Sequence, residues 1–364
     1  MLTIGVDARS VLCKEPRGEG KSLLRLYAEM LRQQSDLKVW FFGDSKASEF
    51  TGTLPPGLCV DAPRSWGHRI NGWENISLPW RAWRRGCDVL HCASSGAPRF
   101  SAVPVMLTVH DLIPLVFDDG QNSRFKANFA RRLDNGLAIA RRIVTVSEHT
   151  RKDLLARTPQ LSTPVDVVHW GGDDLVGDGP LPTPASPPYL LAFGGESRRK
   201  NTDYLLDRFI AIAPSFSELR LVLVGVSAAW QRRQLAQRLS ETGLADRVTL
   251  TAFVSEAELD GLFNGAIAVL YPSLYEGFGL PLLEAIGRGV PVLASDCSSI
   301  PEVLGGAPGA LPLRPSENVD AILLRLVSDA EFREQWVRRQ RTELDRFRWS
   351  DVANRTVESL RATM

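Results

Sequence analysis

Long apolar runs, an excess of one charge and a regular cysteine pattern are all missing from this sequence of 364 residues. No run of about 18 apolar residues occurs, so no transmembrane helix is expected. The formal net charge is +1, so no global field attracts nucleic acid, and none is expected as a partner. No signal sequence precedes the first expected strand, Thr3 to Val6. The cysteines are odd in number and lack metal-ligand spacing, which indicates reduced thiols in a cytoplasmic protein: Cys13, Cys59, Cys87, Cys92 and Cys297.

The chain is too long for one ordinary core and carries two successive series of strands and helices. Between them, residues 178–188 read D-G-P-L-P-T-P-A-S-P-P, a composition typical of a stiff linker. Alternating strands and helices favour parallel sheets. We therefore predict an α/β protein of two doubly wound, Rossmann-like domains facing across a cleft. The predicted domains are residues 1–177 and 189–349, and a last helix over 350–364 is expected to pack back on the first.

Residues 51–80 are rich in Pro, Gly and Trp and are predicted to be irregular. One interpretation of this region is an amphipathic patch in peripheral contact with the inner face of a membrane, since Trp and Arg suit the bilayer interface. The other is a helix leading into a strand over 88–91, with its aromatic side chains inward and its arginines in water. Both interpretations concern the same alternating residues: Trp66, Trp73, Trp80 and Trp83 with Arg64, Arg69, Arg81, Arg84 and Arg85.

Two motifs follow the expected strands of the first domain. Residues 17–22 read R-G-E-G-K-S and form a predicted loop before an amphipathic helix. Such a loop often receives a phosphate, and a plain turn is the alternative. The strand over 104–109 ends at His110, at the edge where α/β proteins bind ligands. A structural histidine is the alternative there.

The stretch from Tyr275 to Ala285 reads Y-E-G-F-G-L-P-L-L-E-A and lies between two apolar runs. Its glycines suit a strand-to-helix turn, and Pro281 suits the first turn of a helix. An anion at that helix N-terminus would meet free backbone N–H groups. Glu276 and Glu284 would repel the anion, so we expect them to accept hydrogen bonds from neutral hydroxyl groups on either side of it. A hydroxyl, a phosphate and a second hydroxyl outline a nucleotide sugar.

With these residues the chain resembles the retaining GT-B glycosyltransferases of the large group 1 family, family 4. The E-x7-E signature of that family matches Glu276 to Glu284. An E-x7-E alone is a weak signal, but the ordered set of matching segments is specific for the fold and the reaction class. The further matches cover nearly the whole chain: residues 5–9, 108–114, 146–150, 199–201, 289–295 and 299–303.

The resemblance implies roles for the matching residues. Glu284 would bind the ribose hydroxyls of the nucleotide, and Glu276 the hydroxyls of the donor sugar. Lys200 would neutralise the diphosphate leaving group together with Arg199 or Arg198, because Gly195 stands where many members have an arginine. The remaining implied contacts are His110 near the anomeric carbon, Gly277, Phe278, Gly279 and Leu280 at the diphosphate, Phe253 and Val254 at the base, and Gly18 and Gly20 in the first loop.

The implied activity is transfer of a hexose, with retention at the anomeric carbon, from a nucleoside-diphosphate sugar to a glycan or lipid-linked saccharide. Its setting would be cell-surface polysaccharide, O-antigen or exopolysaccharide biosynthesis. GDP-mannose is the preferred donor and a UDP-hexose the second. A basic pair is available and no D-x-D follows a strand, so neither a divalent metal nor another cofactor is expected. The alternatives are a UDP-glucose-dependent glucosyltransferase, an epimerase or a glycogen/starch-type synthase of this fold, and an inactive sugar-binding scaffold.

Overall fold

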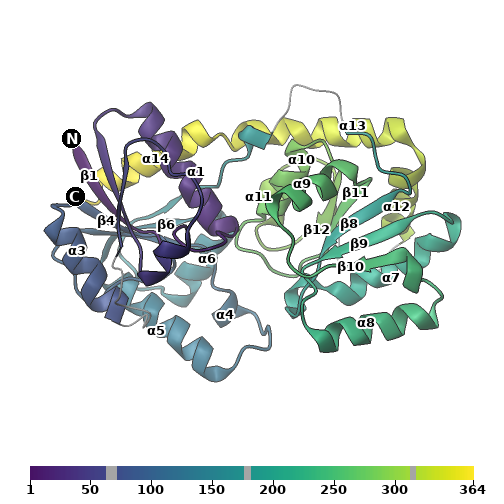
Figure 1. Ribbon diagram of the computed structural model, residues 1–364, viewed down its shortest axis with the longest axis horizontal. Coiled ribbons are helices and arrows are strands. Elements are labelled where there is room, and N and C mark those ends of the chain that lie inside the picture. The colour runs from purple at the N-terminus through teal and green to yellow at the C-terminus, as the bar shows by residue number, and fades with distance from the viewer. Residues whose placement is uncertain (63–71, 176–181, 312–316) are drawn as a thin grey trace. The chain divides into compact units, whose positions relative to one another are not determined.

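The structure is a computed structural model that describes residues 1–62, 72–175, 182–311 and 317–364. It divides into two compact units, each with its own parallel sheet (Figure 1). The first unit comprises Met1–Val116, Gln121–Gly171 and Phe347–Met364. The second unit comprises Phe117–Gly120 and Gly172–Arg346. The chain therefore enters the second unit twice and returns to the first at its C-terminal end.

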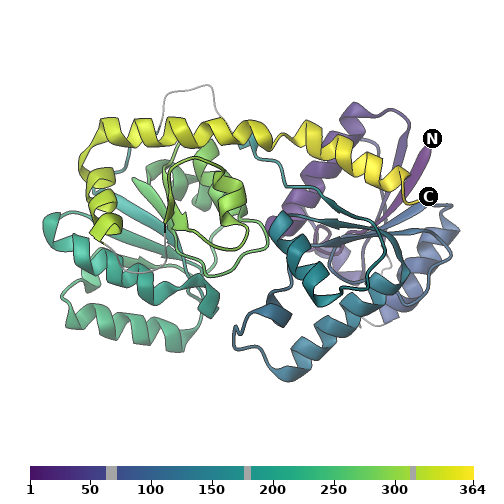
Figure 2. The ribbon, with the colours of Figure 1, turned by 180° about the vertical axis from the view of Figure 1, so that it is seen from behind.

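The first unit is built on a seven-stranded parallel sheet in the order β3-β2-β1-β4-β5-β6-β7. The order reverses between β1 and β4, which places a topological switch point at their carboxyl ends. The C-terminal helix α14 lies along α1 (Figure 2). The strands are β1 (Leu2–Asp7), β2 (Leu37–Phe42), β3 (Leu58–Asp61), β4 (Val89–Cys92), β5 (Val105–Val109), β6 (Ala140–Thr145) and β7 (Val165–Val167). The helices are α1 (Gly18–Gln33), α3 (Leu78–Arg84), α4 (Ile113–Val116), α5 (Ser123–Ile139), α6 (Glu148–Arg157) and α14 (Trp349–Arg361).

The second unit repeats this plan with a six-stranded sheet in the order β10-β9-β8-β11-β12-β13. Its switch point lies between β8 and β11, which pair in parallel. The strands are β8 (Tyr189–Phe193), β9 (Arg220–Val224), β10 (Val248–Leu250), β11 (Ala268–Tyr271), β12 (Val292–Ser295) and β13 (Ala310–Leu311). The helices are α7 (Thr202–Ile212), α8 (Ala229–Glu241), α9 (Glu256–Gly265), α10 (Leu280–Gly287), α11 (Ile300–Leu304), α12 (Glu317–Ser328) and α13 (Ala330–Arg341).

Burial on both faces explains why the central strands read as unbroken apolar runs. All five residues of β5 are buried, as are all four of β11. Helices on either side supply the rest of each core, for example Phe209 of α7 and Leu133 of α5, which are completely buried. The α/β class with parallel sheets that the sequence predicts is confirmed.

The prediction of an irregular segment over residues 51–80 is wrong in two places. Residues 58–61 form β3, which pairs with β2 at the edge of the sheet. From Trp73 the chain is helical, first as the π-helical turn η2 (Trp73–Ser77) and then as α3. Trp66, Arg64 and Arg69 lie outside the described residues.

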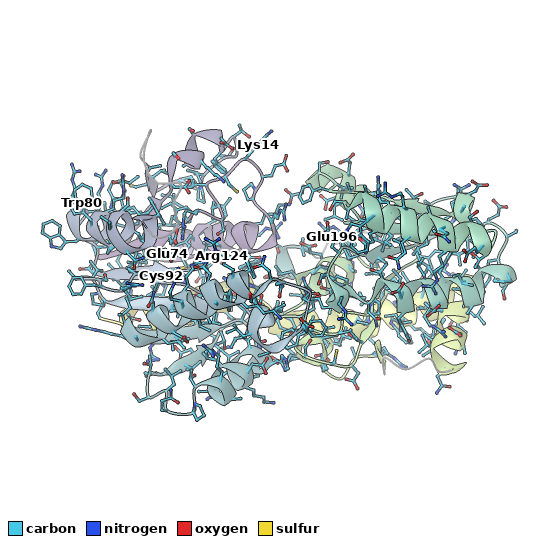
Figure 3. The ribbon with its side chains drawn as sticks, turned by 90° about the horizontal axis from the view of Figure 1, so that it is seen from below. Lys14, Glu74, Trp80, Cys92, Arg124 and Glu196 are labelled. Atoms are coloured by element: carbon cyan, nitrogen blue, oxygen red, sulfur yellow. The ribbon has the colours of Figure 1, made fainter. Side chains whose placement is uncertain are left out.

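The second interpretation of this region, a helix with its aromatic side chains inward, is correct for only one of the three tryptophans that the structure describes there. Trp73 is completely buried, whereas Trp80 is 48% exposed and Trp83 is 63% exposed. Figure 3 shows Trp80 projecting away from the body of the first unit.

The division between the units falls at Gly172, a few residues before the predicted linker. Residues 178–181 of that linker lie outside the described residues, and residues 182–188 have no helix or strand. No helix in the described ranges is long and apolar enough to cross a membrane.

Gly20 is a position where packing excludes a side chain. A Cβ added at Gly20 would lie 2.0 Å from the backbone carbonyl oxygen of Ser10. Gly20→Ala is therefore expected to destabilise the first unit by about 1–3 kcal/mol, because backbone has to move. Gly261 is the matched control, since it also lies in a helix and a Cβ there would meet nothing within 4 Å. Gly261→Ala should raise the midpoint of thermal unfolding, because Ala favours helix by about 1 kcal/mol over Gly. Equal midpoints for the two variants would contradict this assignment.

Candidate functional site

The loops that follow β8 and β11 lie side by side at the switch point of the second sheet. β8 leads through residues 194–197 into the 3-10 turn η4 (Arg198–Lys200). Asn201 then turns the chain into α7 with a left-handed φ of 51°, a conformation that Asn tolerates better than most residues. β11 leads through residues 272–279 into α10. Charged residues on two distant stretches of sequence therefore meet at one edge.

Glu276, Arg199 and Lys200, all predicted site residues, form one ion cluster. Oε1 of Glu276 accepts from Nη1 of Arg199 at 2.6 Å and from Nζ of Lys200 at 2.8 Å. Glu276 is only 8% exposed. The Lys200 ammonium also lies 4.9 Å from the ring centroid of Tyr271, a cation–π contact at the end of β11. One buried carboxylate thus holds two cations in fixed positions.

The pKa values of this cluster follow from burial and from the charges around it. Burial alone would raise the pKa of the Glu276 carboxyl, but the charges of Lys200 and Arg199 outweigh burial and lower it. Burial lowers the pKa of Lys200 below that of an ordinary lysine, although Glu276 opposes this shift. Glu276 is therefore ionised at neutral pH, and its charge helps Lys200 to keep its proton.

Asp119 is a member of the site that sequence reasoning missed. Residues 117–120 belong to the second unit although the chain on either side belongs to the first. The Asp119 carboxylate accepts hydrogen bonds from the Ser197 hydroxyl and, at 3.1 Å, from the backbone N–H of Arg199. It also lies 3.8 Å from Nε of Arg199. Arg199 is thus held by carboxylates at both its backbone and its guanidinium. The only sequence signal is an acidic pair before a glycine, which equally describes a solvated turn.

Two serines after β12 hold the loop that carries Glu276. The Ser298 hydroxyl accepts the backbone N–H of Glu276 at 3.0 Å. The buried Ser299 hydroxyl contacts the carbonyls of Glu276 and Phe278, at 3.0 and 2.8 Å. Ser298 itself has a left-handed φ of 53°. Residues 299–303 resemble a family segment, but only the fold shows what these serines do for Glu276.

The helix start predicted near Pro281 is confirmed, because α10 begins at Leu280. Gly279 precedes it with a φ of 116°, which strongly favours glycine. Phe278 is buried, while Gly277 and Glu284 are half-buried on either side of the helix start. The predicted diphosphate-binding backbone and both glutamates therefore lie on one short segment.

The other predicted donor contacts lie around this centre. Arg198 is exposed and lines a cavity of about 480 Å³, together with Trp230 and Gln231 of α8. Phe253, which is 60% exposed, and Val254 follow β10, which lies two strands from β8. The predicted contacts therefore follow several strands at the carboxyl ends of one sheet.

Gly195 stands where many family members have an arginine, and its backbone conformation accounts for the glycine. Its φ of 137° lies in a region that L side chains rarely adopt. An arginine at this position would be strained, so the cations of this edge come from η4 instead.

His110 lies in the first unit, directly after β5. Its Nε2 contacts the carbonyl oxygen of Ala93 at 2.5 Å, so that nitrogen carries a proton. The imidazole stacks on Trp170 with ring centroids 5.8 Å apart, and the His110 carbonyl accepts the Thr150 hydroxyl at 3.2 Å. The ring is therefore fixed in one orientation with Nδ1 as the acceptor of the neutral form.

Gly18 and Gly20 do not form a loop, and the predicted loop over residues 17–22 is wrong. Both glycines lie in the first turn of α1, which begins at Gly18. Glu19, between them, accepts the Ser94 hydroxyl at 2.8 Å and lies 3.6 Å from Nε2 of His110. This arrangement brings the start of α1 and the residue after β5 to the same edge of the sheet. Glycine lowers helix propensity, which explains why sequence reasoning started the helix too late.

Within the described ranges, no three His, Cys, Asp or Glu side chains are grouped as a metal site would require.

Lys200 is expected to titrate below pH 10.5, the ordinary lysine value, because its ammonium is buried. Removing the opposing carboxylate in Glu276→Gln should lower the Lys200 pKa further, since Glu276 stabilises the charged form. An NMR pH titration of protein with ¹³C-labelled lysine measures both values, and the signal missing from Lys200→Arg assigns the residue. A Lys200 pKa at or above 10.5, or one that rises in Glu276→Gln, would contradict the ion cluster.

Two family descriptions match consecutive parts of the chain. "Glycosyltransferase Family 4" matches residues 16–174, and "Glycosyl transferases group 1" matches residues 179–343. The "O-antigen chain mannosyltransferase B" of Escherichia coli is 29% identical over 225 residues, which cover 60% of this chain and 54% of that protein. The chain thus matches about half the length of the curated relatives of this kind.

Solved structures agree with this chain along its whole length. Sucrose-phosphate synthase from Thermosynechococcus elongatus has a TM-score of 0.74 at 18% identity, covering 99% of this chain and 98% of its own. Anabaena Alr3699/HepE in complex with UDP-glucose has a TM-score of 0.69 at 17% identity and covers 100% of both chains. At this identity the likeness concerns the fold. Together with the two family descriptions, it shows that this chain belongs to the group 1, family 4 glycosyltransferases of the GT-B fold.

Proposed function

We propose that this protein transfers a hexose, with retention at the anomeric carbon, from a nucleoside-diphosphate sugar to a hydroxyl of a glycan or lipid-linked saccharide. The observation that carries the proposal is the ion cluster of Glu276, Arg199 and Lys200 at the switch point of the second sheet. That sheet lies in the part matched by the group 1 description. The proposed setting is the assembly of a cell-surface polysaccharide.

The cations of the cluster suit a diphosphate leaving group. Negative charge grows on the β-phosphate as the glycosidic bond breaks. A cation that is already in place stabilises this charge more in the transition state than in the ground state. Arg199 and Lys200 are both fixed by Glu276, and Arg199 also by Asp119. Fixed cations supply the charge that a divalent metal would otherwise provide, so we propose that transfer needs no metal.

The two glutamates are assigned to the two ends of the donor. Glu284, within α10, is proposed to bind the ribose hydroxyls, and Glu276 the hydroxyls of the sugar. The start of α10 between them offers backbone N–H groups and the positive end of the helix dipole to the diphosphate. His110 is proposed to lie near the anomeric carbon of the donor. Hydrogen bonds fix the orientation of both its backbone carbonyl and its imidazole. With no carboxylate assigned as a nucleophile, the departing phosphate is the proposed base for attack on the same face.

Mannose is the proposed sugar, with GDP-mannose as donor. Similarity to the E. coli O-antigen chain mannosyltransferase supports this choice and also supports an acceptor in polysaccharide assembly. UDP-glucose is the second candidate, because the Anabaena protein of the same fold has been solved with that donor.

Glu276 belongs to the ion cluster and Glu284 does not, so we expect their replacement to affect different steps: transfer for Glu276 and nucleotide binding for Glu284. Glu276→Ala should lower the rate of transfer by at least about a hundredfold, the order lost when one charge-positioning group is removed. It should not weaken nucleoside diphosphate binding, because Arg199 and Lys200 then lose their competing carboxylate. Glu284→Ala should weaken that binding by about tenfold, as expected for one hydrogen bond to a charged group. Calorimetric titration with the diphosphate and a transfer assay measure the two effects.

Glu218→Ala is the matched control for these variants. Glu218 is exposed and lies before β9, at the amino end of the strand and away from the site. It should change neither the rate nor the affinity. Transfer by Glu276→Ala at the wild-type rate would refute the site assignment.

The donor can be identified by thermal unfolding in the presence of GDP-, UDP- and dTDP-sugars. A ligand that binds only the folded protein raises its stability by about 2.7 kcal/mol at a hundred times its Kd. GDP-mannose is expected to give the largest rise in Tm, and the rise should shrink in Glu284→Ala. A larger rise with UDP-glucose would favour the second candidate, and no rise with any nucleotide sugar would contradict the proposed function.

A further inference from the structure

One face of the helical segment 73–84 is apolar and open to solvent. Ile76 is 71% exposed, Trp80 48% and Trp83 63%. Their spacing of four and three residues places them on one side of a continuous helical segment, η2 followed by α3. Phe100, 75% exposed, is brought to the same segment because the backbone N–H of Arg99 donates to Asn75 at 2.9 Å. We call these four side chains the apolar patch.

The opposite face of the segment is firmly anchored, so the patch cannot turn inward without breaking buried contacts. Trp73 is completely buried, and its indole N–H lies 3.4 Å from the Asp7 carboxylate. Glu74 is 2% exposed and accepts hydrogen bonds from Arg9 and Arg132. Figure 3 shows the contrast, with Glu74 inside the unit and Trp80 projecting from it. Leaving a buried charge unpaired costs about 3–5 kcal/mol, which holds this orientation.

The charge around the patch is positive. α3 contains Arg81 and Arg84 and no acidic residue, and Arg85 follows directly. Arg81 and Arg85 share the single carboxylate of Asp61. Arg84 is exposed and stacks over the Trp80 ring, 5.1 Å from its centroid. Arg99, also exposed, lies beside Phe100. Exposed tryptophan with adjacent exposed arginine is the combination found where proteins contact a bilayer interface.

We propose that the apolar patch, with Arg84 and Arg99, docks the first unit on the surface of an anionic phospholipid membrane. Ile76, Trp80, Trp83 and Phe100 would enter the boundary between headgroups and acyl chains, while the two arginines meet lipid phosphates. Apolar burial and electrostatic attraction are both needed for such binding, and the patch supplies both. A protein partner that covers the patch would need acidic groups opposite the same arginines.

The patch lies away from the sheet edge at which His110 follows β5. The anchors Asp7 and Glu74 sit at that edge, and the helical segment then runs back towards the amino end of β4, which begins at Val89. Docking through Trp80 and Trp83 therefore does not require that edge to contact the membrane. The inference goes beyond the proposed transfer reaction and does not depend on it, because lipid binding is measured without donor or acceptor.

Co-sedimentation with vesicles tests the proposal in the 364-residue chain. One set of vesicles is phosphatidylcholine alone, and the other contains about one third phosphatidylglycerol. The wild-type protein should sediment with the anionic vesicles and much less with the neutral ones. Trp80→Ala/Trp83→Ala should weaken vesicle binding by about tenfold or more, from the lost burial of two large side chains. Arg84→Glu/Arg99→Glu should weaken it by about fivefold or more per arginine, from about 1 kcal/mol each.

Trp230→Ala is the matched control for vesicle binding, because Trp230 is 54% exposed but lies on α8 of the second unit. It should leave sedimentation with vesicles unchanged. All of these side chains are exposed, so the midpoints of thermal unfolding should also stay close to wild type. Sedimentation velocity without lipid tests whether the patch instead joins two copies of the chain.

Three results would overturn the proposal. The first is a wild-type protein that binds neither set of vesicles. The second is binding that the tryptophan and arginine variants leave unchanged. The third is a dimer that the Trp80→Ala/Trp83→Ala variant dissociates. Loss of vesicle binding with a normal Tm rise from nucleotide sugar would show that docking and donor binding are separate properties.

Discussion

The buried carboxylate of Glu276 is the constraint on which the arrangement of the second unit depends. It joins the loop after β11 to the turn after β8 through Arg199 and Lys200. Removing one partner of such a buried pair costs about 3–5 kcal/mol, because the remaining charge loses its compensation. Ser298 and Ser299 hold the backbone of Glu276, and Asp119 holds that of Arg199. Glu276 and Arg199 are therefore each held by contacts outside the cluster, and Lys200 also lies over the ring of Tyr271.

The first unit also has buried carboxylates paired with arginines, at the end of its first strand. Asp7 and Glu74 are almost completely buried and are compensated by Arg9 and Arg132. Arg9 keeps the pKa of the Asp7 carboxyl low, although burial acts to raise it. Nearby, burial lowers the pKa of His91 to about 3, so this histidine is neutral and structural. His110 differs because it lies after the strand rather than within it. Position relative to the strand end separates the structural histidine from the candidate one.

The periodic and apolar features of the chain could be predicted from its sequence, and so could the residues of the ion cluster. Apolar runs located β1, β4 and β5, and the E-x7-E stretch located α10. Asp119 could not be found, because it lies 80 residues before Arg199 and in the sequence context of the first unit. Ser298 could not be assigned either, since its role depends on a left-handed backbone. The start of α1 was missed because tertiary packing of Gly20 against Ser10 overrides the low helix propensity of glycine.

The segment 73–84 shows why periodicity alone does not say which side of a helix faces water. Trp73, Trp80 and Trp83 have the same chemistry, yet one is buried and two are exposed. What separates them is the buried pairing of Glu74 with Arg9 and Arg132, a polar contact that fixes the rotation of the helix. The inward face is itself apolar, because Leu78 and Ala82 are completely buried together with Trp73. Turning Trp80 and Trp83 inward would expose these side chains and would also break the charge network, so both effects keep the second apolar face outside.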